Sequence, residues 1–159
     1  MVGRIFIGGR LDDKNYPGLL QVYESIDKLC QELEIPTYMP HRDTRNSLRS
    51  KYKRPSDIVK NLHANDVDAF VSSELGLIDL TLPSHGVGGE CLVGEMFDID
   101  VIAFANMDVI VSVDVIGNSA IKIFFRYKNA NDLVEKLRPL LIEWKKDSNY
   151  VTKMYGWKK

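Results

Sequence analysis

The sequence predicts an α/β fold in which a mostly parallel sheet of about five strands carries helices on both faces. Short apolar runs alternate along the chain with longer stretches in which apolar residues recur every three or four positions. The short apolar runs are typical of buried strands, and the longer periodic stretches are typical of amphipathic helices. Their alternation along the chain indicates β-α-β units. The 159 residues suit one domain. We expect that domain to span 1–147, followed by a polar C-terminal tail over 148–159.

The chain is predicted to begin with a buried strand over Arg4–Ile7 that ends at two glycines. Pro17 suits the first position of a helix, because that position needs no N–H donor. The following residues are apolar at helical spacing until Pro36, which stops the helix. Thr37–Met39 is predicted to be a second short strand.

A polar and basic loop is expected over 40–55. Within residues 42–54, six Lys and Arg residues accompany a single acid, Asp43. Such a segment is either a solvated lid over a site or a guide that attracts an anionic ligand. The sequence leaves both interpretations open.

In the middle of the chain, Ser56 is expected to cap a helix that runs to about Ser73. A strand over Leu75–Leu80 follows, then a glycine-rich loop over Leu82–Gly89 and a helix over Glu90–Phe97.

The C-terminal part contains a predicted strand over 101–105 and a last strand over 121–127. Residues 110–116 are β-branched and fit either a strand or a short helix. The Asn-Asp pair at 131–132 is predicted to cap a final helix over 133–146.

The composition excludes several classes of protein. Hydrophobic residues make up 45% of the chain, which excludes disorder as its main state. Twenty-one basic and 22 acidic residues give a net charge of −1, which argues against a general binder of nucleic acid or membrane surfaces. We expect neither a signal peptide nor a membrane span, because the apolar runs are too short. Cys30 and Cys91 form no CxxC pair, which favours a cytoplasmic location.

The segment Leu82–Glu90 follows a predicted strand, and ligands of parallel sheets bind beyond such strand ends. Its glycines, among them Gly86 and Gly88, allow backbone N–H groups to approach an anion, and Ser84 adds a hydroxyl donor. The Walker and GxGxxG patterns are both absent. Glu90 is either a reactive carboxylate or an acid that the helix dipole stabilises.

Asp66 lies 24 residues before Glu90, with one predicted strand between them. This spacing places both carboxylates at one end of the sheet, as cleavage or transfer at a glycosidic bond requires. The alternative is that Asp66 is a solvated helix residue.

Five segments in this order resemble a known family: Arg4–Gly9, Asn65-Asp66, Ser73–Asp79, Pro83–Glu90 and Asp100–Phe104. They are similar to the nucleoside 2-deoxyribosyltransferase superfamily, and most similar to its 2'-deoxynucleoside 5'-phosphate N-hydrolase branch. The resemblance covers about residues 4–140. It implies a flavodoxin-like, Rossmann-like parallel sheet, a homodimer with shared active sites, and no cofactor.

The resemblance also implies roles for individual residues. Glu90 matches the nucleophile that attacks the anomeric carbon. Asp66 matches the carboxylate that positions the sugar and assists proton transfer to the leaving base. Ser84 matches a serine that binds the 5'-phosphate, where the transferases usually carry Asp, and Gly9 matches a glycine near that phosphate.

Two further matches and three departures concern the substrate pocket. His41 matches a histidine that lines the pocket, and Ser112 resembles a serine that reaches the phosphate of the partner subunit. Phe6 stands where the family often has a Tyr, so its ring cannot donate a hydrogen bond to the nucleophile or the sugar. Glu74 replaces an Asp. Arg10 replaces a Ser, and either strengthens phosphate binding or lies at the surface.

We therefore expect an enzyme that cleaves the N-glycosidic bond of a nucleoside 5'-monophosphate and releases the free base. The alternatives are a transferase that exchanges bases and a nucleotide-binding module without catalysis. His63 and His85 have no partner at ligand spacing, so no metal site is expected. The expected partners are the nucleotide or nucleoside substrate and a second copy of the chain, with no nucleic acid and no membrane.

Overall fold

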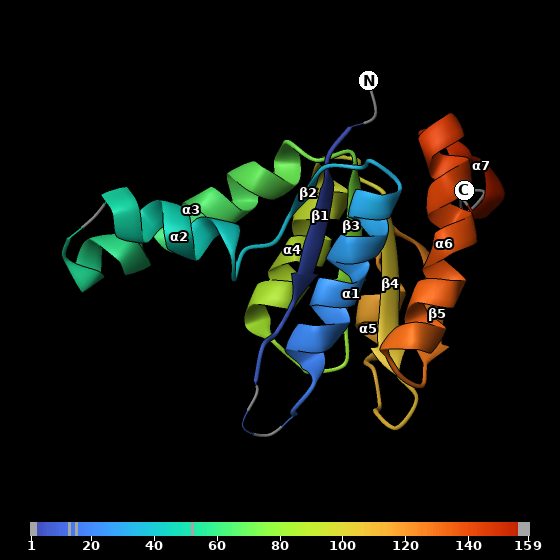
Figure 1. Cartoon of the computed structure of the whole chain (residues 1–159), viewed down its shortest axis with the longest axis horizontal. Helices are drawn as coiled ribbons and strands as arrows, with labels where there is room; N and C mark the ends of the chain where they lie inside the picture. The colour runs from blue at the N-terminus through green and yellow to red at the C-terminus, as the bar shows by residue number, and fades with distance from the viewer. Residues whose placement is uncertain (1–2, 13, 15, 52, 156–159) are drawn as a thin grey trace.

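The computed structural model describes residues 3–12, 14, 16–51 and 53–155, and these form one five-stranded sheet (Figure 1). Neighbouring strands are all parallel, in the order β2-β1-β3-β4-β5. The strands are β1 (Ile5–Gly9), β2 (Thr37–Tyr38), β3 (Leu75–Asp79), β4 (Val101–Asn106) and β5 (Ile121–Tyr127). The predicted fold class is confirmed, and so is each predicted strand.

The helices connect these strands and extend beyond the last one. They are α1 (Leu19–Glu32), α2 (Asp43–Lys51), α3 (Pro55–Val71), α4 (His85–Met96), α5 (Val113–Ile116), α6 (Ala130–Lys146) and α7 (Tyr150–Tyr155).

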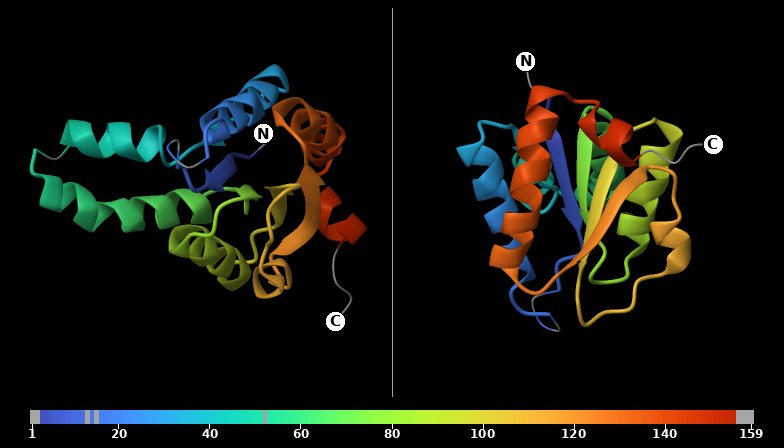
Figure 2. Two further views of the ribbon diagram at one scale, coloured as in Figure 1. Left: turned by 90° about the horizontal axis from the view of Figure 1, so that it is seen from below. Right: turned by 90° about the vertical axis from the view of Figure 1, so that its right-hand side faces the viewer.

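The sheet lies between two layers of helices, as Figure 2 shows. On one face, α1 packs beside α6 over a core that includes Tyr23, Phe104 and Trp144. On the other face, α3 and α4 pack together over a smaller core that includes Phe6 and Phe70. Because both faces are covered, β1, β3 and β4 are buried on both sides, and this explains their continuous apolar runs.

Residues 40–55 do not form the predicted loop, because α2 occupies most of that segment. α2 packs against α3, and the two helices extend from the body as an arm (Figure 1). Leu48 of α2 is buried. Arg42 forms ion pairs with Asp27 at 2.8 Å and with Asp43 at 2.7 Å, which fix the start of the helix. The ion pair with Asp27 and the packing on α3 join separate segments, so the local pattern of one apolar residue among charges did not indicate them.

The segment predicted as a glycine-rich loop is largely helical, because α4 begins at His85 and not at Glu90. Ser84 is the N-cap, and its Oγ accepts a hydrogen bond from the N–H of Gly86 at 3.2 Å. Glycine disfavours a helix interior by about 1 kcal/mol relative to alanine. The cap and the buried side chain of Val87 favour the helix despite this cost.

Three other helices begin at residues that differ from the prediction. α1 begins two residues after Pro17, and α3 begins at Pro55, one residue before the predicted cap at Ser56. α6 is capped by Asn129 and not by the pair at 131–132, because Asn129 Oδ1 accepts a hydrogen bond from a backbone N–H in the first turn at 3.0 Å. The start of a helix thus depends on one side-chain rotamer or one proline ring.

Residues 110–116, for which the sequence leaves strand and helix open, contain the one-turn helix α5. The segment predicted as a polar tail includes α7, whose Val151 is fully buried in the core beside α1 and α6. Among the described residues, no helix has both the length and the apolar character needed to cross a bilayer.

Candidate active site

The carboxyl group of Glu90 on α4 lies against the backbone of β1. A Cβ added at Gly8 would lie 2.4 Å from Glu90 Oε2, so the absence of a side chain at this position makes room for the carboxyl group. Oε2 is buried and has no hydrogen-bond partner in the described part of the chain. Burial, and after it the negative charge of Asp66, raises the pKa of Glu90 to about 8. Such surroundings are typical of a carboxyl group with a chemical role.

Asp66 of α3 is half-buried and lies within electrostatic range of Glu90. Burial raises the pKa of Asp66, and a hydrogen bond from Thr44 partly opposes that rise. Thr44 of α2 donates this bond from Oγ1 to Asp66 Oδ1 at 2.5 Å. The hydroxyl group of Tyr38, at the end of β2, lies 2.6 Å from Thr44 Oγ1. The hydrogen bond from Thr44 therefore orients the carboxyl group of Asp66, and Glu90 is the second acid of the pair.

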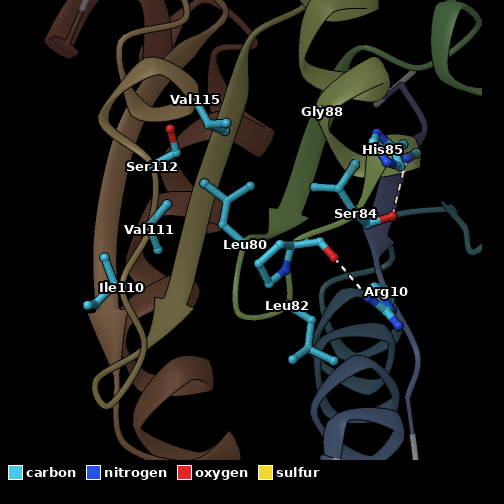
Figure 3. A pocket seen from close by; sticks show the side chains of 13 residues that line it. Arg10, Leu80, Leu82, Ser84, His85, Gly88, Ile110, Val111, Ser112 and Val115 are labelled. Atoms are coloured by element: carbon cyan, nitrogen blue, oxygen red, sulfur yellow. Dashed lines mark hydrogen bonds between the residues drawn. The ribbon is translucent and has the colours of Figure 1, made fainter.

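A pocket of about 750 Å³ opens at the N-terminus of α4 (Figure 3). Its walls come from the segments that follow β1, β3 and β4. Arg10 Nη1 donates a hydrogen bond to the carbonyl oxygen of Pro83 at 3.0 Å, which holds the guanidinium group beside Ser84 (Figure 3). A helix N-terminus, a hydroxyl group and a guanidinium group together form a site that suits an anion such as a phosphate.

Five of the predicted substrate-binding residues line this pocket: Arg10, Ser84, Gly86, Gly88 and Ser112. Ser112 precedes α5 and is exposed at the opposite wall from Arg10 (Figure 3).

The other three predicted substrate-binding residues do not line this pocket. Phe6 is fully buried, with its ring 4.8 Å from that of Phe70, so it supports the sheet under the site and presents no surface to a ligand. Gly9 faces the opposite side of the sheet, where a Cβ would lie 2.4 Å from the hydroxyl oxygen of Tyr23. His41 lines a separate pocket of about 390 Å³ beside α1.

Glu74 lies far from these residues along the strands. It precedes β3 and lines a pocket at the amino ends of β3, β4 and β5. A Cβ at Gly3 would lie 1.9 Å from the carboxyl carbon of Glu74, so the Glu74 side chain packs closely on that backbone. The departure from the family pattern at position 74 is therefore remote from Glu90.

A buried polar cluster at the ends of β3 and β5 was not predicted. Asp79 accepts hydrogen bonds from the N–H of Thr81 at 2.8 Å and from the hydroxyl group of Tyr127 at 3.1 Å. Thr81 Oγ1 in turn accepts a bond from the N–H of Asn106 at 2.9 Å. The cluster joins the loops after β3 and β4, which line the pocket. An Asp-x-Thr sequence directly after an apolar run is a turn signal that indicates such a cluster.

The described residues contain no group of three or more His, Cys, Asp or Glu side chains arranged to hold a metal ion.

Comparisons with known proteins identify the fold. No family model and no curated protein matches the sequence of this chain. Among solved structures, a 2-deoxyribosyltransferase from Bacillus psychrosaccharolyticus is similar, with 13% identity over 82% of this chain and 90% of that one and a TM-score of 0.60. The CMP N-glycosidase BcmB of Clostridium botulinum has 14% identity, over 86% of this chain and 98% of its own, and a TM-score of 0.59.

A conserved protein from Enterococcus faecalis V583 has 15% identity, over 88% of this chain and 99% of its own, and a TM-score of 0.59. At these identities the likeness concerns the fold alone. The chain therefore has the fold of a deoxyribosyltransferase and of an N-glycosidase, as the resemblance of its sequence segments implied.

Proposed function

We propose that this protein cleaves the N-glycosidic bond of a nucleoside 5'-monophosphate and releases the free base. The observation that carries the proposal is the buried Glu90 carboxyl group, with an unpartnered oxygen in the described structure and a pKa raised to about 8. Asp66 lies within electrostatic range of it, and the anion pocket opens at the first turn of the same helix. In this proposal Glu90 is the nucleophile, Asp66 is the second carboxyl group, and the pocket at the first turn of α4 is the phosphate subsite.

Near neutral pH the two carboxyl groups share one proton, because ionising both would place two negative charges together in a buried site. In the proposed reaction, the Glu90 carboxylate attacks C1' and the C1'–N bond breaks, with its electron pair going to the base. Asp66 carries the shared proton and gives it to the base. Water then attacks C1' of the glycosyl-enzyme, which frees Glu90 and returns a proton to Asp66.

This scheme has a defined pH dependence. The active protein holds one proton on the pair, so the rate falls at acid pH, where the pair takes up a second proton. It also falls above about 8, where Glu90 has lost its proton before substrate binds.

The 5'-phosphate would occupy the pocket at the N-terminus of α4, where the hydroxyl group of Ser84 and the guanidinium group of Arg10 lie together. If a free base attacks the glycosyl-enzyme in place of water, the outcome is base exchange. The likeness to a 2-deoxyribosyltransferase favours this reaction as the second candidate.

We further propose a homodimer. Three large apolar side chains at the C-terminal end of α4 are exposed: Leu92, Met96 and Phe97. Ile110, which lines the pocket, and Val113, which directly follows the pocket residue Ser112, are exposed as well. A second copy of the chain would bury such apolar surface and close the pocket from outside.

The proposal is tested by incubating the protein with a panel of nucleoside 5'-monophosphates and the matching nucleosides, and measuring free base by chromatography. We expect base release from at least one nucleotide by the wild type and none by Glu90→Gln. Addition of a different free base distinguishes exchange from hydrolysis. Equal release by wild type and Glu90→Gln would remove Glu90 from the mechanism.

Asp66→Asn should lower the rate of base release on the order of 100-fold or more, because an amide cannot carry the shared proton to the base. The circular dichroism spectrum should remain that of the wild type. A loss below about threefold would show that Asp66 is a helix residue without a part in proton transfer.

A further inference from the structure

Thr44 connects α2 to the proposed catalytic pair. It is 1% exposed, although it belongs to a helix of mostly polar and basic residues. Its Oγ1 lies 2.5 Å from Asp66 Oδ1 and 2.6 Å from the hydroxyl oxygen of Tyr38. Tyr38 in turn stacks on Phe6, with ring centroids 6.1 Å apart. The chain of hydrogen bonds from Tyr38 through Thr44 to Asp66 thus joins β2, α2 and α3.

The direction of these hydrogen bonds depends on the protonation of Asp66, because a hydroxyl group carries one proton. When Asp66 is ionised, Thr44 donates to Asp66 and Tyr38 donates to Thr44. When Asp66 is protonated, Asp66 donates to Thr44 and Thr44 donates to Tyr38. Both states keep every link of the chain, so Asp66 gains or loses a proton without leaving a buried hydroxyl group unpaired.

The groups around Asp66 come from three helices. Thr44 approaches from α2, Glu90 acts on it from α4, and His63 lies on α3 itself. His63 lowers the pKa of Asp66, as does the bond from Thr44. The ion pairs at the start of α2 hold Thr44 in its place.

We propose that Thr44 and Tyr38 are positioning residues that determine which carboxyl group of the Glu90–Asp66 pair holds the shared proton. This inference rests on the function proposed above. Before attack, the hydrogen bonds from Tyr38 through Thr44 stabilise ionised Asp66 while Glu90 is protonated. When the proton moves from Glu90 to Asp66, each of these hydrogen bonds reverses its direction. Glu90 is then free to attack C1', and Asp66 holds the proton that the base requires.

The test compares Thr44→Val, which removes the hydroxyl group at nearly the same shape, with Thr44→Ser, which keeps it. The measurement is kcat and kcat/KM for base release from a nucleoside 5'-monophosphate as a function of pH. Thr44→Val should lower kcat about 10- to 100-fold, because protonated Asp66 loses the acceptor that orients its proton. It should also move the acid limb upward by about one pH unit, because ionised Asp66 loses its donor. Thr44→Ser should stay within about threefold of the wild type.

Tyr38→Phe provides a second, independent variant. It should also lower kcat, because the reversed chain loses its last acceptor, but the acid limb should not move upward, since Thr44 still donates to ionised Asp66. Thr152→Val is the matched control, because Thr152 also donates to a carboxylate, that of Asp100, at the amino edge of the sheet. The control should have the kcat and the pH profile of the wild type.

A wild-type pH profile in Thr44→Val, or a Thr44→Ser variant as slow as Thr44→Val, would overturn the inference. If circular dichroism shows that Thr44→Val does not fold, Tyr38→Phe becomes the test of the inference. A wild-type kcat in Tyr38→Phe then overturns it. Base release by Glu90→Gln would contradict the proposed function itself. An inactive Glu90→Gln beside an unaffected Thr44→Val contradicts only the role of Thr44.

Discussion

Glu90 loses its proton at a higher pH in the folded protein than a carboxyl group does in water, because burial and Asp66 both disfavour its charge. The native state keeps the proton on Glu90 between pH 4.5 and about pH 8, a range in which the unfolded chain has already lost it. The contribution of Glu90 to stability is therefore present at low pH and is lost as the pH rises through this range, by at most about 1.4 kcal/mol per pH unit. The fold opposes the ionisation that the proposed attack on C1' requires.

Glu90→Gln should remove this pH dependence, because an amide does not titrate. We expect the free energy of unfolding of the variant to exceed that of the wild type by an amount that grows between pH 4.5 and about 8. Urea unfolding at a series of pH values measures the difference, with the surface variant Glu135→Gln as the control. A difference that stays constant with pH would contradict a buried, proton-holding Glu90.

We expect Ser84, which lines the pocket, to determine whether the pocket accepts a phosphate. Ser84→Asp should abolish the preference for a nucleotide over its nucleoside, because a carboxylate beside the phosphate adds a repulsion of several kcal/mol at intermediate dielectric. Ser84→Ala should weaken the preference less, by about 1.5–3 kcal/mol, the contribution of one hydrogen bond to a charged group. The measurement is kcat/KM for a nucleotide and its nucleoside on all three proteins. Equal kcat/KM on both substrates in the wild type would favour nucleoside deoxyribosyl transfer.

At the level of the element, α4 combines a poor helix-forming sequence with an N-terminus that lines the pocket. A Cβ at Gly88 or Gly89 would meet no atom within 4 Å, so the fold itself does not require glycine at either position. Gly88 lines the pocket, and Gly89 is not among the lining residues. Gly88 thus leaves space for a ligand next to the helix backbone.

Gly88→Ala and Gly89→Ala form a matched pair. Both should raise the free energy of unfolding by about 1 kcal/mol, because alanine favours a helix over glycine. Only Gly88→Ala should lower kcat/KM for the nucleotide, by about tenfold, since its methyl group enters the pocket. Thermal unfolding and base release measure the two effects. Equal kcat/KM in both variants would place the ligand away from the first turns of α4.

At the level of the whole molecule, the exposed apolar end of α4 predicts the assembly. Met96→Glu should dissociate the proposed homodimer, because it places a charge in a buried interface. Val59→Glu, on the arm and equally exposed in the single chain, is the control and should remain dimeric. Sedimentation velocity measures the mass of each protein. A monomeric wild type, or a dimeric Met96→Glu, would contradict this interface.

Features within one segment of the chain could be predicted from the sequence. The strands β1, β3 and β4 could be predicted because each is a short, mostly apolar run buried on both faces. The parallel sheet follows from the alternation of strands with helices. The glycine-rich segment was predicted to be an anion site, since Ser84 and its glycines are neighbours in sequence, and it lines the pocket at the N-terminus of α4. Its helical state was missed, because glycine disfavours a helix and the cap at Ser84 had to outweigh it.

Features that join distant segments were decided only by the tertiary structure. α2 is stabilised by the ion pair of Arg42 with Asp27 at its N-terminal end and by its packing on α3. Neither contact produces a periodic apolar pattern in the sequence. The link from Thr44 to Asp66, the close approach of Glu90 to Gly8, and the placement of His41 in a separate pocket depend on how helices pack on the sheet. Residue spacing predicts which strand end a side chain follows. Its burial, its partners and its proton affinity are set by the segments that pack around it, and these become neighbours only in the folded chain.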